Sequence, residues 1–284
     1  MSTSTASIAT PSGKSAASEN FPVGSFLIRA DLRPHVHAFY RFARMGDDIA
    51  DNAALAPADK VARLDCMEAV LLDPTREDIP EAADLRRSLV TTGVSPVNAT
   101  DLLKAFRMDA TKQRYADWDE LMTYCRYSAA PVGRQLLDLH GEAAEARPPA
   151  DALCASLQVL NHLQDCGVDF LEMDRVYVPQ DHLAAAGAVT AQLAEGKSTT
   201  ALRACLDALL DRTEALQIEA RRLPGALRDF RLRAESATIV RLGDKMLEQL
   251  RHRDPLAGRV KPTKWFFLTA MIEGVAWALV TGRK

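Results

Sequence analysis

The sequence predicts an all-α protein, and three observations lead to that prediction. Alanine and leucine are frequent throughout the 284 residues, whereas β-branched and aromatic residues rarely form runs. Apolar residues recur at the three- and four-residue spacing of helices along most of the chain. Short joints rich in Pro, Gly or Asp separate these periodic stretches, as helix ends require. A chain of this length can bury a substantial core.

Nine or ten helices follow from this periodicity, divided by joints such as LDPTRED, GVSP, GEAAEARPPAD and HRDPLAGRVKP. No joint is long or biased enough to separate two domains. We therefore expect a flexible tail at residues 1–18 and one helical domain at residues 19–284. The clearest helices are expected at residues 31–54, 59–72, 81–92, 96–110, 117–140, 150–170, 199–222, 229–252 and 264–280.

Charge and cysteine content exclude several classes of function. A formal net charge of −3 provides no general positive field, which argues against a nucleic-acid partner. Residues 1–18 lack the apolar segment of a secretory signal, so we expect a cytoplasmic protein. Five widely spaced cysteines without a C-x-x-C pair support neither a disulfide framework nor a zinc site: Cys66, Cys125, Cys154, Cys166 and Cys205.

The most apolar stretch, WFFLTAMIEGVAWALV, lies near the C-terminus. It carries Glu273 and is shorter than the roughly 20 apolar residues that a membrane-spanning helix needs. We favour a terminal helix docked on the protein and leave a peripheral contact with a membrane surface as the alternative.

The stretch RFARMGDDIADN places Asp47, Asp48 and Asp51 at the end of the first predicted helix. Like charges one turn apart repel by about 0.2–0.5 kcal/mol on a helix surface, so the spacing brings no structural advantage. Arg44 and Tyr40 fall on the same stripe, one and two turns earlier. A solvated acidic face is the simple interpretation, and a bound cation is the functional one.

A second stripe favours the cation. In SLQVLNHLQDCGVDF, the residues Gln158, Asn161, Asp165 and Asp169 are spaced by three, four and four, with leucine and valine between them. Both stretches thus contain a D-x-x-x-D pair. Magnesium prefers one or two carboxylates together with water and phosphate oxygens, so two such helices suit several Mg²⁺ ions around a diphosphate. Calcium is disfavoured because its 12-residue loop is absent.

Two further segments complete the predicted site. In YCRYSAAPVGR, Pro131 kinks a helix and small residues leave space beside Tyr124, which suits an apolar chain next to an aromatic face. Such a face stabilises a carbocation. In DRVYVP, Arg175 is placed to reach a phosphate and Tyr177 to line the cavity. Packing alone and a plain extended link are the alternatives.

With these motifs in this order, the chain resembles the squalene/phytoene synthase family of trans-isoprenyl diphosphate synthases. The matching segments are FYRFARMGDDIAD, YCRYSAAPVGR and LNHLQDCGVDFLEMDRVYVP, and the resemblance extends over residues 18–265. SENFPVGS and YCRYSAAPVGR are most similar to the branch that makes hydroxysqualene in the hopanoid pathway. The family usually has Ser-x-Ser-Phe where this chain has Ser18-Glu19-Asn20-Phe21, a departure that fits this branch.

The resemblance implies the all-α isoprenoid synthase bundle, with a central cavity between the two aspartate-rich helices. It also implies Mg²⁺-assisted loss of diphosphate from presqualene diphosphate, rearrangement of the cation and capture by water, with no nucleotide cofactor. It assigns metal binding to Asp47, Asp48, Asp51, Asp165 and Asp169. It assigns catalysis to Tyr124, Tyr177, Asp51 and Asp165, and substrate contact to Asn20, Phe21, Tyr40, Arg44, Gln158, Asn161, Gln164, Arg175, Arg259 and Lys264.

Several alternatives stay open at this point. The same metal site would serve a presqualene diphosphate, squalene or phytoene synthase that condenses two prenyl diphosphates. A non-catalytic assembly factor of this superfamily is disfavoured because both D-x-x-x-D pairs are intact. A lipid-binding surface protein would use the apolar C-terminus. The expected small-molecule partner is a prenyl diphosphate, while the oligomeric state and hand-over of product to a neighbouring enzyme stay undetermined.

Overall fold

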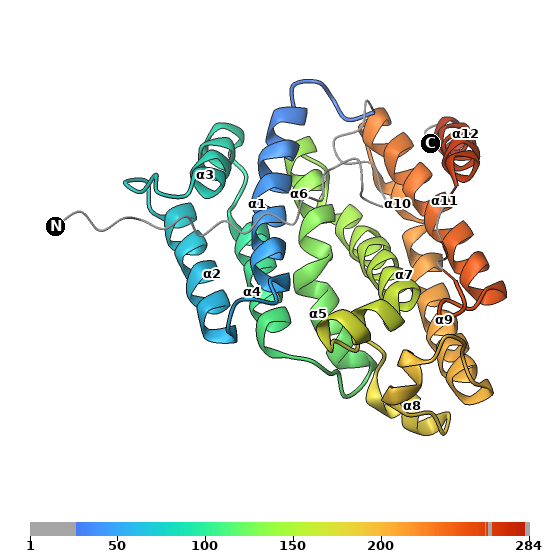
Figure 1. The fold of residues 1–284 in the computed structure, drawn as a ribbon. Coiled ribbons are helices and arrows are strands. Elements are labelled where there is room, and N and C mark those ends of the chain that lie inside the picture. The colour runs from blue at the N-terminus through green and yellow to red at the C-terminus, as the bar shows by residue number, and fades with distance from the viewer. Residues whose placement is uncertain (1–26, 259, 261–262, 282–284) are drawn as a thin grey trace.

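The protein is seen here in a computed structural model that describes residues 27–258, 260 and 263–281 (Figure 1). Within those residues the chain forms twelve α-helices and two short 3-10 helices, and it contains no β-strand. The all-α prediction is confirmed. The helices are α1 (Arg33–Asp51), α2 (Pro57–Leu72), α3 (Pro80–Thr92), α4 (Val97–Thr111), α5 (Trp118–Ser128), α6 (Ala130–His140), α7 (Arg147–Met173), α8 (Gln180–Ala185), α9 (Thr200–Ala220), α10 (Leu223–Ala226), α11 (Phe230–His252) and α12 (Lys264–Thr281).

The helix ends follow local sequence signals. Proline occupies one of the first two positions of α1, α2, α3, α6, α7 and α10, where a missing N–H costs nothing. Gly93 and Gly141 end α3 and α6 with φ of 69° and 63°, a left-handed conformation that favours glycine. Eight of the nine helices expected from periodicity are present, and their ends differ from the expected ends by at most three residues.

The one remaining expected helix, at residues 117–140, is divided into two helices. The prediction of one kinked helix is wrong, because α5 ends at Ser128 and α6 begins at Ala130. Pro131 lies in the first turn of α6, where it starts a helix and does not kink one. The small helices α8 and α10 were not expected, because stretches of six and four residues are too short to show a periodicity.

The helices group in space in the order of the chain. Figure 1 shows α2, α3 and α4 on one side, α9, α11 and α12 on the other, and α5, α6 and α7 between them. One apolar cluster joins α1 to α2, α3 and α4, and a second joins α5 and α7 to α9 and α11. The two aspartate-rich helices, α1 and α7, thus belong to different halves of the bundle, which leaves room for a site between them.

The apolar C-terminal stretch forms α12 and docks on α11, as predicted. Lys245 of α11 pairs with Glu273 at 2.8 Å, and Gly274 lies so close to α11 that a Cβ there would be 2.5 Å from the backbone nitrogen of Thr238. No described helix combines the length and apolar character needed to cross a membrane. All five cysteines are free thiols. The boundary between a tail at residues 1–18 and the folded domain stays a prediction, since residues 1–26 lie outside the described part.

Substitution of Gly274 tests the close contact between α11 and α12. We expect Gly274→Ala to lower the free energy of unfolding by about 1–3 kcal/mol, because the new methyl group overlaps the α11 backbone. The denaturation midpoint in urea measures this loss. Gly196→Ala is the matched control, because a Cβ at Gly196 meets no atom within 4 Å. Equal midpoints for the two variants would contradict the close approach.

Candidate active site

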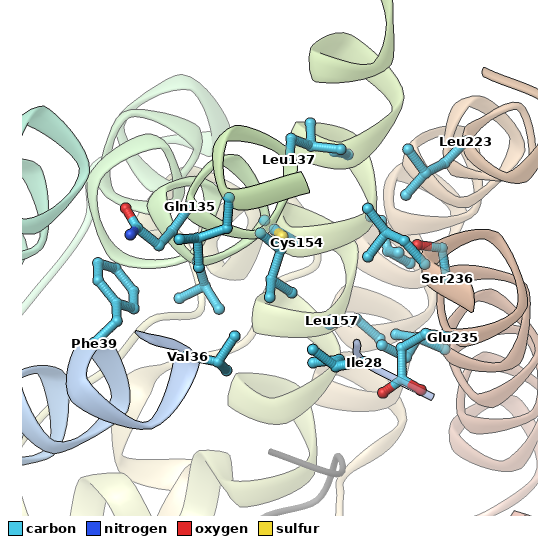
Figure 2. Close-up of a pocket in the computed structure, with 18 of the residues that line it drawn as sticks. Ile28, Val36, Phe39, Gln135, Leu137, Cys154, Leu157, Leu223, Glu235 and Ser236 are labelled. Atoms are coloured by element: carbon cyan, nitrogen blue, oxygen red, sulfur yellow. The ribbon is translucent and has the colours of Figure 1, made fainter. Parts of the chain in front are cut away.

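An apolar cavity of about 250 Å³ lies between α1, α6, α7 and α11 (Figure 2). The expected cavity between the two aspartate-rich helices is therefore present. Figure 2 shows side chains from all four helices turned toward it. Its wall is mostly aliphatic and aromatic, and representative lining residues are Val36, Phe39, Leu137, Cys154, Leu157 and Ile239.

A few polar side chains interrupt the apolar wall. Gln135 is 1% exposed and Glu235 is 3% exposed, and both line the cavity together with Ser236. Figure 2 shows Glu235 reaching from α11 toward Ile28. These residues were not predicted from the sequence, because each lies in an ordinary amphipathic helix and no motif marks it.

The helices α1 and α7 both lead from this cavity to their acidic pairs. On α1, Tyr40 lines the cavity and Asp51 follows about 16 Å farther along, at 1.5 Å per residue. On α7, Leu157 lines the cavity and Asp165 follows about 12 Å farther along. The same two helices therefore line the apolar chamber and carry the acidic pairs.

Arg44 neutralises part of the first acidic pair. Its guanidinium lies 3.0 Å from Asp47 Oδ2, and its Nε donates to Asp48 Oδ1 at 2.9 Å. The Arg44 side chain is 15% exposed. Arg44 thus offsets part of the repulsion between the carboxylates of α1. The expectation that their spacing brings no structural advantage was incomplete, because it considered the carboxylates without this arginine.

Arg175 joins the ends of α1 and α7. It donates to Asp51 Oδ1 at 2.6 Å and to the carbonyl of Ala50 at 2.9 Å, and its side chain is 7% exposed. The chain reaches this position through Asp174, which ends α7 with φ of 50° and lets the Arg175 N–H bond the carbonyl of Asp169. A left-handed turn thus directs Arg175 back toward the first aspartate motif.

The predicted DRVYVP link is extended and lies beside the segment that follows α4. The N–H of Val176 donates to the carbonyl of Gln113 at 2.9 Å, and this pairing brings the ring of Tyr177 within 5.6 Å of that of Tyr115. Pro179 precedes α8, as expected of the end of an extended link.

Two predicted tyrosines meet on one buried carboxylate. Tyr124 donates to Asp109 Oδ2 at 2.9 Å, and Tyr177 donates to the other oxygen at 2.8 Å. Burial raises the pKa of Asp109, although Arg175 and the two hydroxyls oppose that rise. Burial also raises the pKa of both tyrosines well above 10, so the phenols stay neutral and their protons point at Asp109.

His162 connects this cluster to the second aspartate motif. Its ring stacks on Tyr177 with centroids 3.5 Å apart, and its Nε2 accepts from the amide of Gln158 at 3.0 Å. Its Nδ1 lies 3.8 Å from Asp169 Oδ2. Asp51 and Asp169, the last aspartates of the two motifs, therefore flank the same group of aromatic rings.

Comparison with known proteins identifies this arrangement. The family model described as squalene/phytoene synthase matches residues 14–266. The chain belongs to the squalene/phytoene synthase family. It is 51% identical to a hydroxysqualene synthase of Sinorhizobium fredii over 85% of this chain and 82% of that protein. It is 42% identical to a hydroxysqualene synthase of Zymomonas mobilis over 96% and 90% of the two chains.

A solved structure agrees with the fold. The squalene synthase HpnC from Alicyclobacillus acidocaldarius superposes with a TM-score of 0.73 at 33% identity, covering 81% of this chain and 87% of that one. The resemblance to the family and the isoprenoid synthase fold are thus both confirmed.

Most of the site residues predicted from the family lie in the described part of the chain. Asn161 and Asp165 are partly buried on α7, whereas Gln164 is 3% exposed and its amide has no hydrogen-bond partner among the described residues. Asn20, Phe21 and Arg259 lie outside the described residues, as does the side chain of Lys264 at the start of α12. All the family-based roles stay predictions.

Two residues beside Tyr124 and Tyr177 were missed. Asp109 lies three residues after Phe106 and seven after Leu102, on the buried face of α4, and an acidic residue on such a face is a signal that could have been used. His162 lies four residues after Gln158 and seven before Asp169, so it shares their face of α7, and this helical spacing is also a signal that could have been used.

The carboxylates fit a hard cation that brings its own water. In the described residues, no group of three or more His, Cys, Asp and Glu side chains is arranged to hold a metal ion alone. The predicted donors are aspartate oxygens divided between α1 and α7, and such a divided set suits Mg²⁺ because this ion keeps water and substrate phosphate among its ligands.

A pH series tests the buried state of Asp109. An aspartate whose pKa is raised by folding binds more protons when folded, so its contribution to stability falls as the pH rises above about 3.9. We expect the unfolding free energy of Asp109→Asn, relative to wild type, to increase between about pH 4 and pH 7. Urea unfolding at several pH values measures it. A flat difference for Asp109→Asn would refute burial as the cause.

Proposed function

We propose that the chain is a hydroxysqualene synthase, which releases diphosphate from presqualene diphosphate and captures the rearranged cation with water. The observation that carries the proposal is the 51% identity with a hydroxysqualene synthase over most of both chains. As a member of its family, the chain is an isoprenoid diphosphate-processing enzyme. The apolar cavity and the acidic pairs, which lie on the same two helices, support a substrate with a hydrocarbon body and a diphosphate group.

At the charged end, Arg44 and Arg175 would bind the diphosphate and orient it. Arg44 and Arg175 are partly to deeply buried, and a guanidinium matches a diphosphate oxygen pair with two parallel N–H donors. Both already contact the first aspartate motif, so binding the substrate there would place it beside the carboxylates. The buried amide of Gln164 adds polar atoms whose hydrogen bonds are still unmade within the described structure.

The aspartates would hold the metal. Asp47, Asp48 and Asp51 on α1 and Asp165 and Asp169 on α7 would bind Mg²⁺, which when bound stabilises the charge of the departing diphosphate. Arg44 and Arg175 keep the α1 carboxylates oriented until then. His162 is a neighbour of Asp169, with its Nδ1 3.8 Å from Asp169 Oδ2.

At the reacting centre, the neutral tyrosines would act on the cation. Because the hydroxyls of Tyr124 and Tyr177 donate to Asp109, the two phenols keep a fixed orientation, and as an electron-rich cluster they would stabilise a nearby positive charge. The rings of Tyr115, Tyr124 and Tyr177 lie within 6 Å of one another, and His162 lies within 6 Å of Tyr124 and Tyr177, which keeps the geometry of the cluster rigid. The apolar cavity wall keeps bulk water from the cation, so that capture depends on a water held at the boundary between the two parts of the site.

A second candidate is squalene formation, which ends the cascade with a hydride in place of water. One observation favours it, because the solved relative at 33% identity is named a squalene synthase. Condensation of two farnesyl diphosphates is the third candidate, since the same charged end would serve it.

Product analysis decides among these candidates. We expect the pure protein with Mg²⁺ and presqualene diphosphate, without NADPH, to give hydroxysqualene by mass spectrometry, because no group other than water is needed to end the reaction. A parallel incubation with farnesyl diphosphate is the control. Squalene formed only with NADPH, or consumption of farnesyl diphosphate while presqualene diphosphate persists, would replace the proposal by one of its alternatives.

Substitutions of one aspartate from each motif test the metal role. We expect Asp51→Asn and Asp165→Asn each to slow diphosphate release by about 100-fold or more, because several kcal/mol of charge stabilisation is lost. Circular dichroism checks that each variant is folded. Asp84→Asn on α3 is the control, since its side chain is 42% exposed and lies on another helix. Full turnover in either site variant would remove that aspartate from the metal site.

A further inference from the structure

The first aspartate motif lies at the end of α1 where a helix tolerates negative charge least. The last four carbonyl groups of a helix have no partner within it, and the aligned peptide dipoles make this end negative, so cations are favoured there and carboxylates are not. Asp48 and Asp51 nevertheless lie in the last turn of α1, and that turn contains no basic residue. A compensating positive charge at this end therefore has to come from outside the turn.

A lysine of α2 supplies part of that charge. Lys60 Nζ donates to the carbonyl of Ala50 at 2.7 Å, and Arg175 donates to the same carbonyl at 2.9 Å. Ala50 is 1% exposed, and its carbonyl is one of the four that have no partner within α1. Two cations from different segments thus bind one buried carbonyl in the residue directly before Asp51.

The position of Lys60 is unfavourable for its own helix. Lys60 is the fourth residue of α2 and lies in its first turn, the positive end of the helix, where a lysine is disfavoured. Burial and the nearby Arg175 lower the pKa of Lys60, whereas Asp51 and Asp109 oppose this change. Local preferences are therefore broken in both α1 and α2 at one contact, as is expected where a functional site imposes the arrangement.

We propose that Lys60 is a positioning residue for Asp51 in the metal site, a role that rests on the proposed function. Lys60 fixes the last turn of α1 through the Ala50 carbonyl, while Arg175 holds the Asp51 carboxylate itself at 2.6 Å. Because Arg175 is also proposed to bind the diphosphate, Lys60 is the contact that keeps the end of α1 in place when the substrate arrives.

Position and charge predict opposite effects of Lys60 on Mg²⁺ binding. Removing a positive charge near the site would by itself favour the binding of another cation. Removing a contact that orients a metal ligand typically weakens metal binding by about 10–100-fold. The sign of the change therefore distinguishes a positioning residue from a simple counter-charge.

Calorimetric titration of inorganic diphosphate into the full chain, repeated at several Mg²⁺ concentrations, tests the proposal without turnover. We expect Lys60→Met to raise the Mg²⁺ concentration for half-maximal diphosphate binding by about tenfold. Lys60→Arg keeps a cationic donor for the Ala50 carbonyl and should restore the wild-type requirement. Lys104→Met is the matched control, because Lys104 donates to Asp101 of its own helix at 2.7 Å, and its Mg²⁺ requirement should be unchanged.

Urea unfolding of each variant separates positioning from stability. A lower unfolding midpoint for Lys60→Met with an unchanged Mg²⁺ requirement would show a merely structural role and overturn the proposal. A lower Mg²⁺ requirement in Lys60→Met would assign Lys60 to charge alone, and failure of Lys60→Arg to restore binding would also overturn the proposal. These results would leave the proposed enzymatic function untouched, whereas diphosphate binding by the wild type without any need for Mg²⁺ would remove the metal site and the role of Lys60 together.

Discussion

The ion pair between Arg175 and Asp51 is the contact on which the rest of the site depends. It joins the end of α1 to the turn after α7, two helices that belong to different halves of the bundle. Its arginine is 7% exposed and also holds the carbonyl of Ala50, so the pair is desolvated and geometrically fixed. Removing one partner of such a pair typically costs about 3–5 kcal/mol, because the other charge stays buried.

The same pair organises the aromatic cluster. The chain that carries Arg175 continues directly into Tyr177, whose hydroxyl shares Asp109 with Tyr124. Arg175 also opposes the rise in the pKa of Asp109 that burial causes. A positive guanidinium, a buried carboxyl and two neutral phenols therefore form one electrostatic unit beside the acidic ends of α1 and α7.

A polarity gradient runs along two helices of the molecule. Along α1 and α7, the polarity rises from the residues that line the cavity to the aspartates. Across α11, one side lines the cavity and the other carries α12, on which Phe266, Ala270 and Ala278 are buried. A substrate with a charged head and an apolar body fits the gradient along α1 and α7.

The sequence by itself determined the helical class, eight helices to within three residues, and the two D-x-x-x-D pairs with Tyr40, Arg44 and Arg175 nearby. These are local properties, because the spacing of apolar and acidic residues along one helix does not depend on what packs against it. Motif order was enough to indicate the family.

Only the tertiary structure decided which groups meet. That Asp109 receives two tyrosine hydroxyls and that His162 stacks on Tyr177 depend on contacts between residues 15 to 68 positions apart, which no periodicity encodes. The division of residues 117–140 into α5 and α6 depends on the neighbours of each helix in the same way. Packing selects one of several arrangements that local sequence permits, because burial is a property of the assembled bundle and not of a single helix.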